Sequence, residues 1–294
     1  MNDLVTAVLT TYKREPKIVE RALKSILAQT YDNLEIIVVD DSPSDYPLRE
    51  EVAATVMLYQ HAGVRYIQHS QNLGACAARN SGLEAANGKF IAYLDDDDEW
   101  LPEKIEKQVD VFSNSDESIG LVYNDFIFHN EKTGEIILKK SKKLHRHILY
   151  ELLEHGNVIG GTSIPLIRTS VLREIGGFDV LLEAAQDYDV WVRIAERYTI
   201  KHIDEYLNRY YFHNGEQITF NLQKRLSGRL RIIQKYEHYL ATEKGMCWRL
   251  NMDVAWIYAD MGQKKKAICI YLRNWWKKPF QIIGNMRYLY YILR

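Results

Sequence analysis

Residues 72–102 read NLGACAARNSGLEAANGKFIAYLDDDDEWLP, and this stretch decides the fold class. Its first part, residues 75–86, has the pattern of a helix. Residues 89–94 then form a short apolar run of the kind found in strands that are buried on both faces. The run leads directly into four consecutive carboxylates at residues 95–98. A helix followed by a buried strand with a polar end indicates an α/β protein with a parallel sheet.

The first hundred residues repeat this alternation. Strands are expected at residues 4–9, 34–39, 64–68 and 89–94, with helical patterns between them. Such repeated units predict a Rossmann-like, mostly parallel central sheet with right-handed crossovers and flanking helices. Ligands of such sheets bind beyond the carboxyl ends of the strands. Three of the four strands end in polar sequence that suits a site there, namely TTYKR, DDSP and DDDDEW.

The order is less regular beyond residue 103. The sequence predicts a strand, a hairpin turn, a helix and a further strand, at residues 119–128, 130–134, 187–198 and 199–212. Two glycine pairs, at residues 160–161 and 176–177, bracket a loop-rich segment that could wrap an acceptor.

The pattern is helical from about residue 222 to the end of the sequence. Six positions have a spacing similar to that of one tetratricopeptide unit: Ala255, Tyr258, Gly262, Ala267, Tyr271 and Pro279. One such helical pair cannot bury its own apolar face, so it needs the main domain, a membrane or another subunit to pack on. We therefore expect a domain of residues 1–220 followed by a C-terminal helical region of residues 221–294, rich in basic and aromatic residues.

Composition and charge exclude several classes of protein. Hydrophobic residues make up 47% of the 294 residues and charged residues 26%, which is a globular balance and not a disordered one. The 38 basic and 39 acidic residues nearly cancel, so no nucleic-acid partner is indicated. Three scattered cysteines, Cys76, Cys247 and Cys269, do not suit a disulfide framework or a thiolate metal site. Neither a signal peptide nor a bilayer-spanning apolar run is recognisable, so we expect a cytoplasmic protein.

The even charge balance hides a polarity along the chain. Residues 263–294 contain eight basic residues and no acidic one, while the remainder has a net charge of −9. Aromatic residues lie among these charges: Tyr271, Trp275, Trp276, Phe280, Tyr288, Tyr290 and Tyr291. Basic residues with Trp and Tyr at helical spacing suit an anionic membrane surface, so one interpretation is peripheral contact at the inner face of the membrane. The alternatives are homo-oligomerisation through residues 221–294, or a packed helical region whose lysines are its solvated face.

The four carboxylates Asp95, Asp96, Asp97 and Asp98 are the sharpest chemical signal in the sequence. Adjacent carboxylates repel one another strongly unless something neutralises their charge. Oxygen ligands with open positions suit Mg²⁺ or Mn²⁺ bound together with a diphosphate. The alternative is a solvated acidic turn, which fits poorly because the run ends a buried strand on the binding edge of the sheet.

Five motifs together resemble those of the family-2 glycosyltransferases, nucleotide-sugar enzymes of the GT-A fold. They are VLTTYKR at the first strand, SILAQTYDNLEIIVVDDSP, the stretch 72–102, GGFD at residues 176–179 and QDYDVWVRIA at residues 186–195. The motifs occur in the family's order, and the similarity covers about residues 4–218. The resemblance implies a GT-A domain with a nucleotide-binding half in residues 1–100 and an acceptor-binding half in residues 101–220.

The resemblance also implies roles for four residues at the nucleotide. Thr10 and Tyr12 would contact the nucleoside, with Tyr12 stacking near the base, and Asp41 would hydrogen-bond the base. The alternative for these three is ordinary capping of strand ends. Arg79 resembles the basic residue that the family places near the nucleotide, and its alternative is a surface arginine on a helix.

The metal site follows from the same resemblance. Asp96 would bind the ribose or the metal, and Asp97 would be the direct ligand of Mn²⁺ or Mg²⁺, with a register that is open by one residue and so includes Asp95. His213 occupies a place where related enzymes often have a histidine near the diphosphate. A neutral imidazole could contact the metal or a phosphate, although a lone histidine at a strand end is more often structural.

Asp187 lies where the family carries its catalytic carboxylate. An inverting transfer needs a base to take the proton of the acceptor hydroxyl, and this role depends above all on geometry. The family usually has an acidic residue just before this aspartate, whereas this sequence has Gln186. One alternative is that Asp187 is only a negative charge that the helix dipole stabilises at the start of the helix. The other is that Asp189 is the base.

These features predict an inverting, metal-dependent glycosyltransferase. It would move a sugar from a nucleotide-sugar, expected to be UDP-linked, to a hydroxyl of a growing glycan that belongs to a capsule, a cell wall, a lipid carrier or a protein. A phosphotransferase or receiver-type domain would need a carboxylate after the first strand, where the sequence has Thr10 and Thr11. A non-catalytic scaffold of the same fold, acting through its helical tail, is the remaining alternative, and it predicts decay of the site.

Overall fold

The computed structural model describes residues 3–144, 148–212, 221–242, 244–277, 286 and 288–290. The chain forms two compact units. The first unit comprises Met1–Ile148, Val158–Val180 and Arg193–Asn214, and the second comprises Leu149–Asn157, Leu181–Val192 and Gly215–Arg294. The division of the chain at residue 220 stays a prediction.

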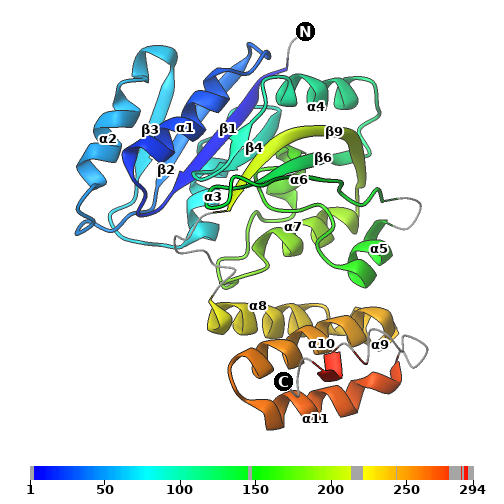
Figure 1. Cartoon of the computed structure of the whole chain (residues 1–294). Helices are drawn as coiled ribbons and strands as arrows, with labels where there is room; N and C mark the ends of the chain where they lie inside the picture. Colours follow the sequence, from blue (N-terminus) through cyan, green and yellow to red (C-terminus); the bar gives the residue numbers. More distant parts are fainter. Residues whose placement is uncertain are drawn as a thin grey trace. The chain divides into compact units, whose positions relative to one another are not determined.

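The parallel half of the central sheet belongs to the first unit and has the strand order β3-β2-β1-β4. It consists of β1 (Val5–Thr11), β2 (Leu34–Asp40), β3 (Val64–Gln68) and β4 (Phe90–Asp95). Thr10 of β1 lies opposite Val39 of β2 and opposite Asp95 of β4. The carboxyl ends of these strands therefore lie side by side at one edge of the sheet (Figure 1). All four predicted strands are confirmed.

Three helices connect these strands: α1 (Pro16–Leu27), α2 (Arg49–Met57) and α3 (Ala75–Ala85), with a short 3-10 turn, η1 (Gln60–Ala62), before β3. Pro16 opens α1, where a missing backbone N–H costs nothing. The buried face of α1 carries Val19, Ala22, Leu23 and Ile26, which follow helical spacing. Helix α3 approaches β1 closely, because a Cβ at Gly82 would lie 2.4 Å from a methyl carbon of Val8.

The second half of the sheet is mixed. The order continues from β4 as β8-β6-β9-β5, and β7 also pairs with β6. The bounds are β5 (Glu99–Trp100), α4 (Lys104–Ser113), β6 (Ile119–Asn130), β7 (Ile136–Lys139), β8 (Leu166–Arg168), α6 (Thr169–Glu174) and β9 (Thr199–Phe212). Strand β8 runs antiparallel to both β4 and β6, whereas the long ladder between β6 and β9 is parallel. The predicted hairpin is confirmed as β6 and β7, and Gly134 turns it with a φ of +69°.

The second unit is helical. It contains most of α5 (Ile148–His155) and α7 (Gln186–Ala195), and all of α8 (Leu222–Lys235), α9 (Glu237–Thr242), α10 (Lys244–Asp260), α11 (Lys264–Asn274) and the 3-10 turn η3 (Trp275–Lys277). Helix α10 lies between α8 and α11 (Figure 1). Met252 and Ala255 of α10 pack against Ala267 and Tyr271 of α11. Another side of α10 packs its Val254 and Ile257 against Leu226 of α8.

The turn between α10 and α11 depends on Gly262. Its φ is +75°, and the N–H of Gln263 donates to the carbonyl of Tyr258, which closes the end of α10 as a Schellman motif. The predicted helical pair is therefore present, with α8 as a third helix beside it. Pro279 lies outside the described residues. No helix within the described part of the chain has both the length and the apolar composition needed to cross a bilayer.

Candidate active site

The carboxyl ends of β1, β2 and β4 bring predicted nucleotide and metal residues to one edge of the sheet. Thr10 lies beside Asp95 in the ladder between β1 and β4. Asp41 follows β2 directly, and its backbone N–H donates to the carbonyl of Thr11 at 2.9 Å. This edge is the candidate active site of the first unit.

The four carboxylates after β4 differ in exposure. The side chains of Asp95 and Asp97 are 31% and 16% exposed. Asp96 and Asp98 are buried. The interpretation as a solvated acidic turn is therefore wrong, because two of the four groups are removed from water.

Arg14 neutralises the middle of the acidic run. Its Nε donates to Oδ1 of Asp96 at 2.7 Å, and its Nη2 donates to Oδ2 of Asp97 at 2.8 Å. The backbone N–H of Tyr12 donates to the other oxygen of Asp96 at 3.2 Å. Burial raises the pKa of Asp96 to about 6, with Arg14 opposing the shift and Asp97 adding to it. Arg14 ends the quoted motif TTYKR, yet sequence reasoning did not single it out.

Arg79 neutralises Asp95. Its Nη2 donates to Oδ1 of Asp95 at 2.7 Å, and the arginine is only 7% exposed. The alternative of a surface arginine is therefore wrong. The hydroxyl of Thr162 also donates to Asp95, at 3.1 Å from Oδ2, and the hydroxyl of Thr10 is 3.4 Å from Oδ1. Asp95 thus presents a partly exposed carboxylate that is held from three sides.

Asp98 has a structural environment. Its Oδ2 accepts a hydrogen bond of 2.6 Å from the hydroxyl of Ser163, whose oxygen accepts the backbone N–H of Asp95 at 3.1 Å. The carbonyl of Ser163 accepts the indole N–H of Trp100 at 2.8 Å. Burial raises the pKa of Asp98 well above its ordinary value, and the neighbouring carboxylates Asp97 and Asp95 add to the shift. Ser163 thus fixes the loop that carries the acidic run.

Asp41 and Tyr12 differ in how accessible their side chains are to a nucleoside. Asp41 is buried and accepts the backbone N–H groups of Leu73 and Gly74, each at 2.8 Å, and Nδ1 of His69 at 2.7 Å. It therefore shapes the loop that leads into α3, and its contact with a base stays a prediction. The side chain of Tyr12 is exposed at the same edge, so it can stack on a ligand.

The donor set at this edge fits a hard divalent cation. Asp95 and Asp97 supply carboxylate oxygens with accessible surface. In the part of the chain that the structure describes, no three His, Cys, Asp or Glu side chains converge on one point. Mg²⁺ and Mn²⁺ sites that use one or two carboxylates plus diphosphate oxygens need no such cage. His213 lies outside the described residues, so its predicted contact stays a prediction.

Helix α7 of the second unit carries Asp187 and Asp189, whose surroundings separate their roles. Asp189 is fully buried and accepts the hydroxyl of Tyr236 at 2.8 Å and Nζ of Lys235 at 2.7 Å. Asp187 is half-buried in the first turn of α7, and its Oδ2 accepts Nδ2 of Asn157 at 2.7 Å. Asp189 therefore ties α7 to the following helices, and Asp187 is the more accessible carboxylate.

Gln186 is buried beside them, and its side-chain amide donates to the carbonyl of Leu182 at 2.9 Å. An ionised glutamate has no proton to donate to that carbonyl. The amide at this position therefore has a local structural use, and it is not a sign of a decayed site.

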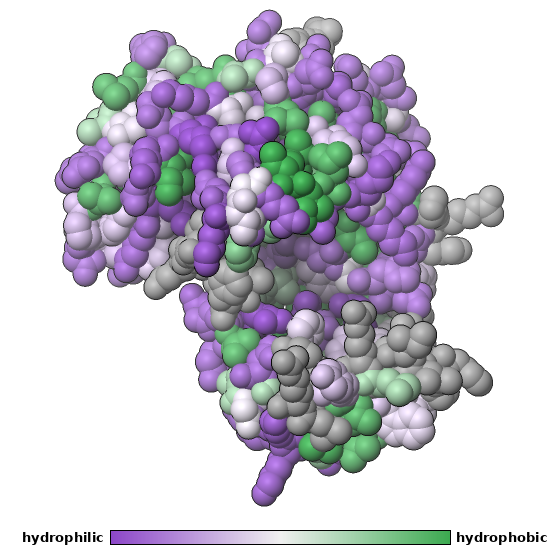
Figure 2. Space-filling view, in the orientation of Figure 1, coloured by the Kyte–Doolittle hydropathy of each residue, from purple (hydrophilic) through white to green (hydrophobic). Residues whose placement is uncertain are grey.

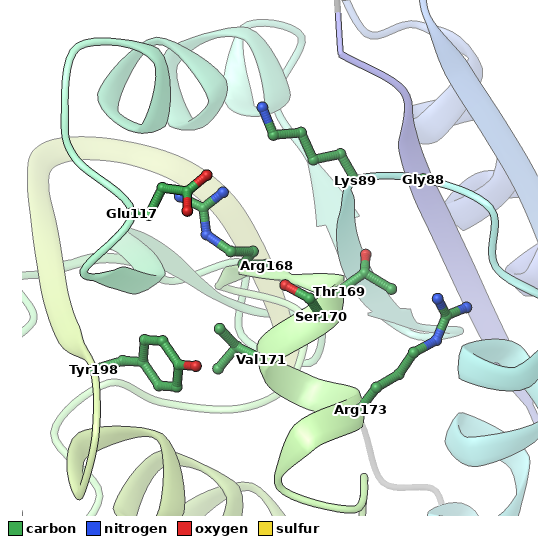
Figure 3. A pocket seen from close by; sticks show the side chains of 9 residues that line it. All are labelled: Gly88, Lys89, Glu117, Arg168, Thr169, Ser170, Val171, Arg173 and Tyr198. Carbon is green, nitrogen blue, oxygen red and sulfur yellow. The ribbon is translucent and has the colours of Figure 1, made fainter.

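A cavity of about 390 Å³ lies elsewhere in the first unit (Figure 3). Its lining comprises Gly88, Lys89, Glu117, Arg168, Thr169, Ser170, Val171, Arg173 and Tyr198. Lys89 precedes β4 and Asp95 ends it, so the cavity and the acidic run are about 20 Å apart along the strand. In Figure 3 the arginines and Lys89 point in different directions, so their charges do not converge on one ligand. The cavity is therefore separate from the candidate active site.

Comparisons with known proteins bear on the family and the fold. The family described as glycosyl transferase family 2 matches residues 6–176 of the chain. An uncharacterized glycosyltransferase of Methanocaldococcus jannaschii is 30% identical over 75% of this chain and 75% of its own length. The Escherichia coli UDP-Glc:alpha-D-GlcNAc-diphosphoundecaprenol beta-1,3-glucosyltransferase WfgD is 28% identical over 68% of this chain and 73% of its own length.

Among solved structures, S. aureus TarS 1–349 in complex with UDP-GlcNAc has a TM-score of 0.60 at 17% identity, and the match covers 86% of this chain and 70% of that one. The match to a longer TarS chain has a TM-score of 0.58 at 16% identity and covers 78% of this chain but only 40% of that chain. Similarity at this level of identity shows the fold. The expected GT-A-like α/β fold with additional C-terminal helices is confirmed.

Proposed function

Since this chain belongs to glycosyl transferase family 2, we propose that it transfers a sugar from a UDP-sugar to a hydroxyl of a growing glycan, with inversion at the anomeric carbon. The observation that carries the proposal is the edge of the sheet at β4. Two accessible carboxylates, Asp95 and Asp97, lie there beside two arginines, Arg14 and Arg79. The mixture of charges suits a nucleoside diphosphate bound with a divalent cation.

The proposed donor has support from one relative and from one protein of similar fold. TarS 1–349 was solved with UDP-GlcNAc, and the name of WfgD gives UDP-Glc as its donor. In this chain the ring of Tyr12 would stack on the uracil, Thr10 and Asp96 would contact the ribose side, and Asp41 would meet the base. Arg79 would lie near the phosphates, because its guanidinium is already held at the strand edge by Asp95.

The proposed chemistry needs a cation and a base. Asp97, with Asp95 beside it, would hold Mn²⁺ or Mg²⁺, which when bound offsets the negative charge that builds on the departing diphosphate. The acceptor oxygen forms a bond to the anomeric carbon while the bond from that carbon to the diphosphate oxygen breaks, and its electron pair leaves with the diphosphate. The carboxylate of Asp187 takes the proton of the acceptor hydroxyl. The amide of Asn157 would orient that carboxylate through its hydrogen bond to Oδ2.

Two substitutions separate donor binding from transfer. We expect Asp97→Asn to abolish the Mn²⁺-dependent stabilisation of the protein by UDP. At a hundredfold excess over Kd that stabilisation is about 2.7 kcal/mol in the wild type, which a thermal-shift measurement detects easily. We expect Asp187→Asn to keep this stabilisation and to lower the transfer rate by about 10²–10⁴-fold.

The matched control is Asp110→Asn, which changes an exposed carboxylate on α4 outside the site. It should bind UDP and transfer sugar like the wild type. Full activity of Asp187→Asn would remove this residue as the base, and unchanged metal-dependent binding by Asp97→Asn would move the metal elsewhere. The alternative, a non-catalytic scaffold, would show no transfer with any donor. The presence of the acidic run and of Asp187 in this chain argues against it.

A further inference from the structure

Helix α11 has two different faces. Its inward face carries Ala267, Tyr271 and Asn274, which are buried. Its outward face carries Lys265, Cys269 and Leu272, and Trp276 of the following turn η3 is exposed as well, so the four residues follow one another at intervals of four, three and four. We call these four residues the outer stripe. Leu272 is 58% exposed and Trp276 is 56% exposed, so the stripe presents large apolar groups to solvent.

The structure thereby sorts the basic and aromatic tail into inner and outer residues. Tyr271 packs in the core of the helical unit, and Tyr288 lies edge-on against Trp248. Trp275 and Trp276 are exposed instead, at 44% and 56%. Figure 2 shows hydrophobic surface over α11, next to hydrophilic side chains.

Every charged residue of α11 is basic. Lys266 and Arg273 are exposed on the same helix, and residues 263–294 contain no acidic residue. Residues 221–294 together contain 15 basic and 4 acidic residues, a net charge of +11. A partner for this surface must therefore accept tryptophan and leucine side chains and also be anionic.

We propose that the outer stripe docks the protein on an anionic lipid bilayer. The tryptophans and Leu272 would enter the boundary between headgroups and acyl chains, while Lys265, Lys266 and Arg273 would contact the lipid phosphates. A second copy of the chain fits less well, because the same lysines would face their own counterparts. Charge complementarity therefore favours an anionic bilayer over a second copy as the partner of the outer stripe. Docking would bring the enzyme to an acceptor that is carried on a membrane lipid, and this consequence rests on the proposed function. The docking itself does not rest on it.

The test uses the full chain and vesicles of phosphatidylcholine with or without phosphatidylglycerol. We expect binding to vesicles with about one third phosphatidylglycerol to be at least tenfold tighter than binding to pure phosphatidylcholine, since each Lys or Arg near the surface adds about fivefold. Two double variants test the apolar and the basic groups separately: Leu272→Ser with Trp276→Ser in the stripe, and Lys265→Gln in the stripe with Arg273→Gln beside it. Each should weaken binding at least tenfold in co-sedimentation, and the residues are exposed, so the fold should tolerate them.

A matched control comes from α8, which is also basic and has an exposed leucine. Leu230 is 45% exposed, and Lys224 is exposed on the same helix. The double variant Lys224→Gln with Leu230→Ser removes the same kinds of group, and we expect its vesicle binding to stay within twofold of the wild type. Equal losses in the α8 and α11 variants would overturn the proposal, because the binding would then not depend on the outer stripe in particular.

A dye attached to Cys269 can report directly whether the outer stripe enters the bilayer. Cys269 is exposed, whereas Cys76 and Cys247 are buried, so a thiol-reactive, polarity-sensitive dye would label it selectively. The emission should shift to the blue when phosphatidylglycerol vesicles are added and stay unchanged with phosphatidylcholine. No shift would overturn the proposal. A change of molecular mass in the Leu272→Ser, Trp276→Ser variant without vesicles would show that a second copy occupies the stripe. Vesicle binding without any UDP-dependent stabilisation would leave the docking intact and remove the proposed function.

Discussion

Arg14 neutralises part of the negative charge of the candidate active site. It joins Asp96 and Asp97, and a divalent cation on Asp97 would compete with its guanidinium for the same carboxylate. We expect Arg14→Gln to destabilise the metal-free protein by about 3–5 kcal/mol, because the buried carboxylate of Asp96 loses its partner. We also expect this variant to bind Mn²⁺ more tightly than the wild type in the absence of nucleotide. Urea denaturation with and without Mn²⁺ measures both effects.

The control for this prediction is Arg14→Lys. A lysine keeps the charge but cannot form the two-pronged contact with neighbouring carboxylates, so its loss of stability should be smaller and its gain in Mn²⁺ affinity slight. An Mn²⁺ affinity that is the same in all three proteins would show that Asp97 is not the ligand.

Lys104 is the second residue whose charge matters, and it lies fully buried at the start of α4. Its Nζ donates to Oε1 of Gln108 at 2.7 Å and lies 4.4 Å from the centre of the Trp100 ring. Burial lowers the pKa of Lys104 well below its ordinary value. The unfolded chain therefore binds the proton over a pH range in which the folded protein has released it, so the free energy of unfolding should rise with pH across that range.

We expect Lys104→Met to remove this rise. Urea denaturation between about pH 6 and pH 10 should show the wild type gaining stability relative to the variant as the pH increases. Lys132→Met, at an exposed position of the first unit, should follow the pH profile of the wild type. Parallel profiles for the wild type and Lys104→Met would show that the buried lysine stays charged.

These residues also mark what sequence reasoning could not reach. Thr10, Tyr12 and the acidic run could be named because each belongs to a local motif at a strand end, and Arg79 could be named because its helix belongs to a motif that resembles the family's. Ser163 could not, because it meets Asp98 from 65 positions away along the chain, and no local pattern reports such a contact. Lys104 has the sequence context of an ordinary helical lysine, and only the packing of α4 shows that it is buried.

At the scale of elements, periodicity predicted the strands and helices well. The four parallel strands span five to seven residues, which is enough for a pattern, whereas β5 and β8 span only two and three residues. Helical spacing likewise placed Tyr271 with the other aromatics of the tail but could not say which face points inward. That distinction depends on the contact between α10 and α11, which follows from tertiary packing.

The turn between α10 and α11 gives a prediction at this scale. Gly262 has a left-handed φ of +75°, and a Cβ there would meet no atom within 4 Å. The cost of a side chain at this position is therefore a backbone cost alone. We expect Gly262→Ala to destabilise the helical unit by about 1 kcal/mol and Gly262→Asn by less, because asparagine tolerates this conformation better. Denaturant unfolding followed by circular dichroism measures the difference, and equal stability of all three proteins would contradict the role given to the turn.

At the scale of the whole molecule, the two ends of the chain have opposite charge. Residues 1–220 contain 23 basic and 35 acidic residues, a net charge of −12, against +11 for residues 221–294. A nucleoside diphosphate and an anionic bilayer are both negative, yet the proposals assign them to parts of the chain with opposite sign. The donor must therefore be held by local groups, the proposed cation with Arg14 and Arg79, whereas the bilayer can be attracted by the summed charge of the C-terminal helices.

This difference predicts that the two kinds of binding respond differently to salt. Exposed charges act over about 30 Å at 0.01 M salt but only about 8 Å at 0.15 M. We therefore expect binding to phosphatidylglycerol vesicles to weaken at least tenfold between these concentrations. Binding of UDP with Mn²⁺ present should change little, because the contacts of UDP are short and partly buried. Salt also screens the repulsion between UDP and the acidic part of the chain, which should offset part of any loss. Calorimetric titration of UDP and vesicle co-sedimentation, each at both salt concentrations, measure the two responses. If UDP binding fell as steeply as vesicle binding, the basic helices would be contributing to the donor site, and the assignment of the nucleotide to the edge at β1, β2 and β4 would fail.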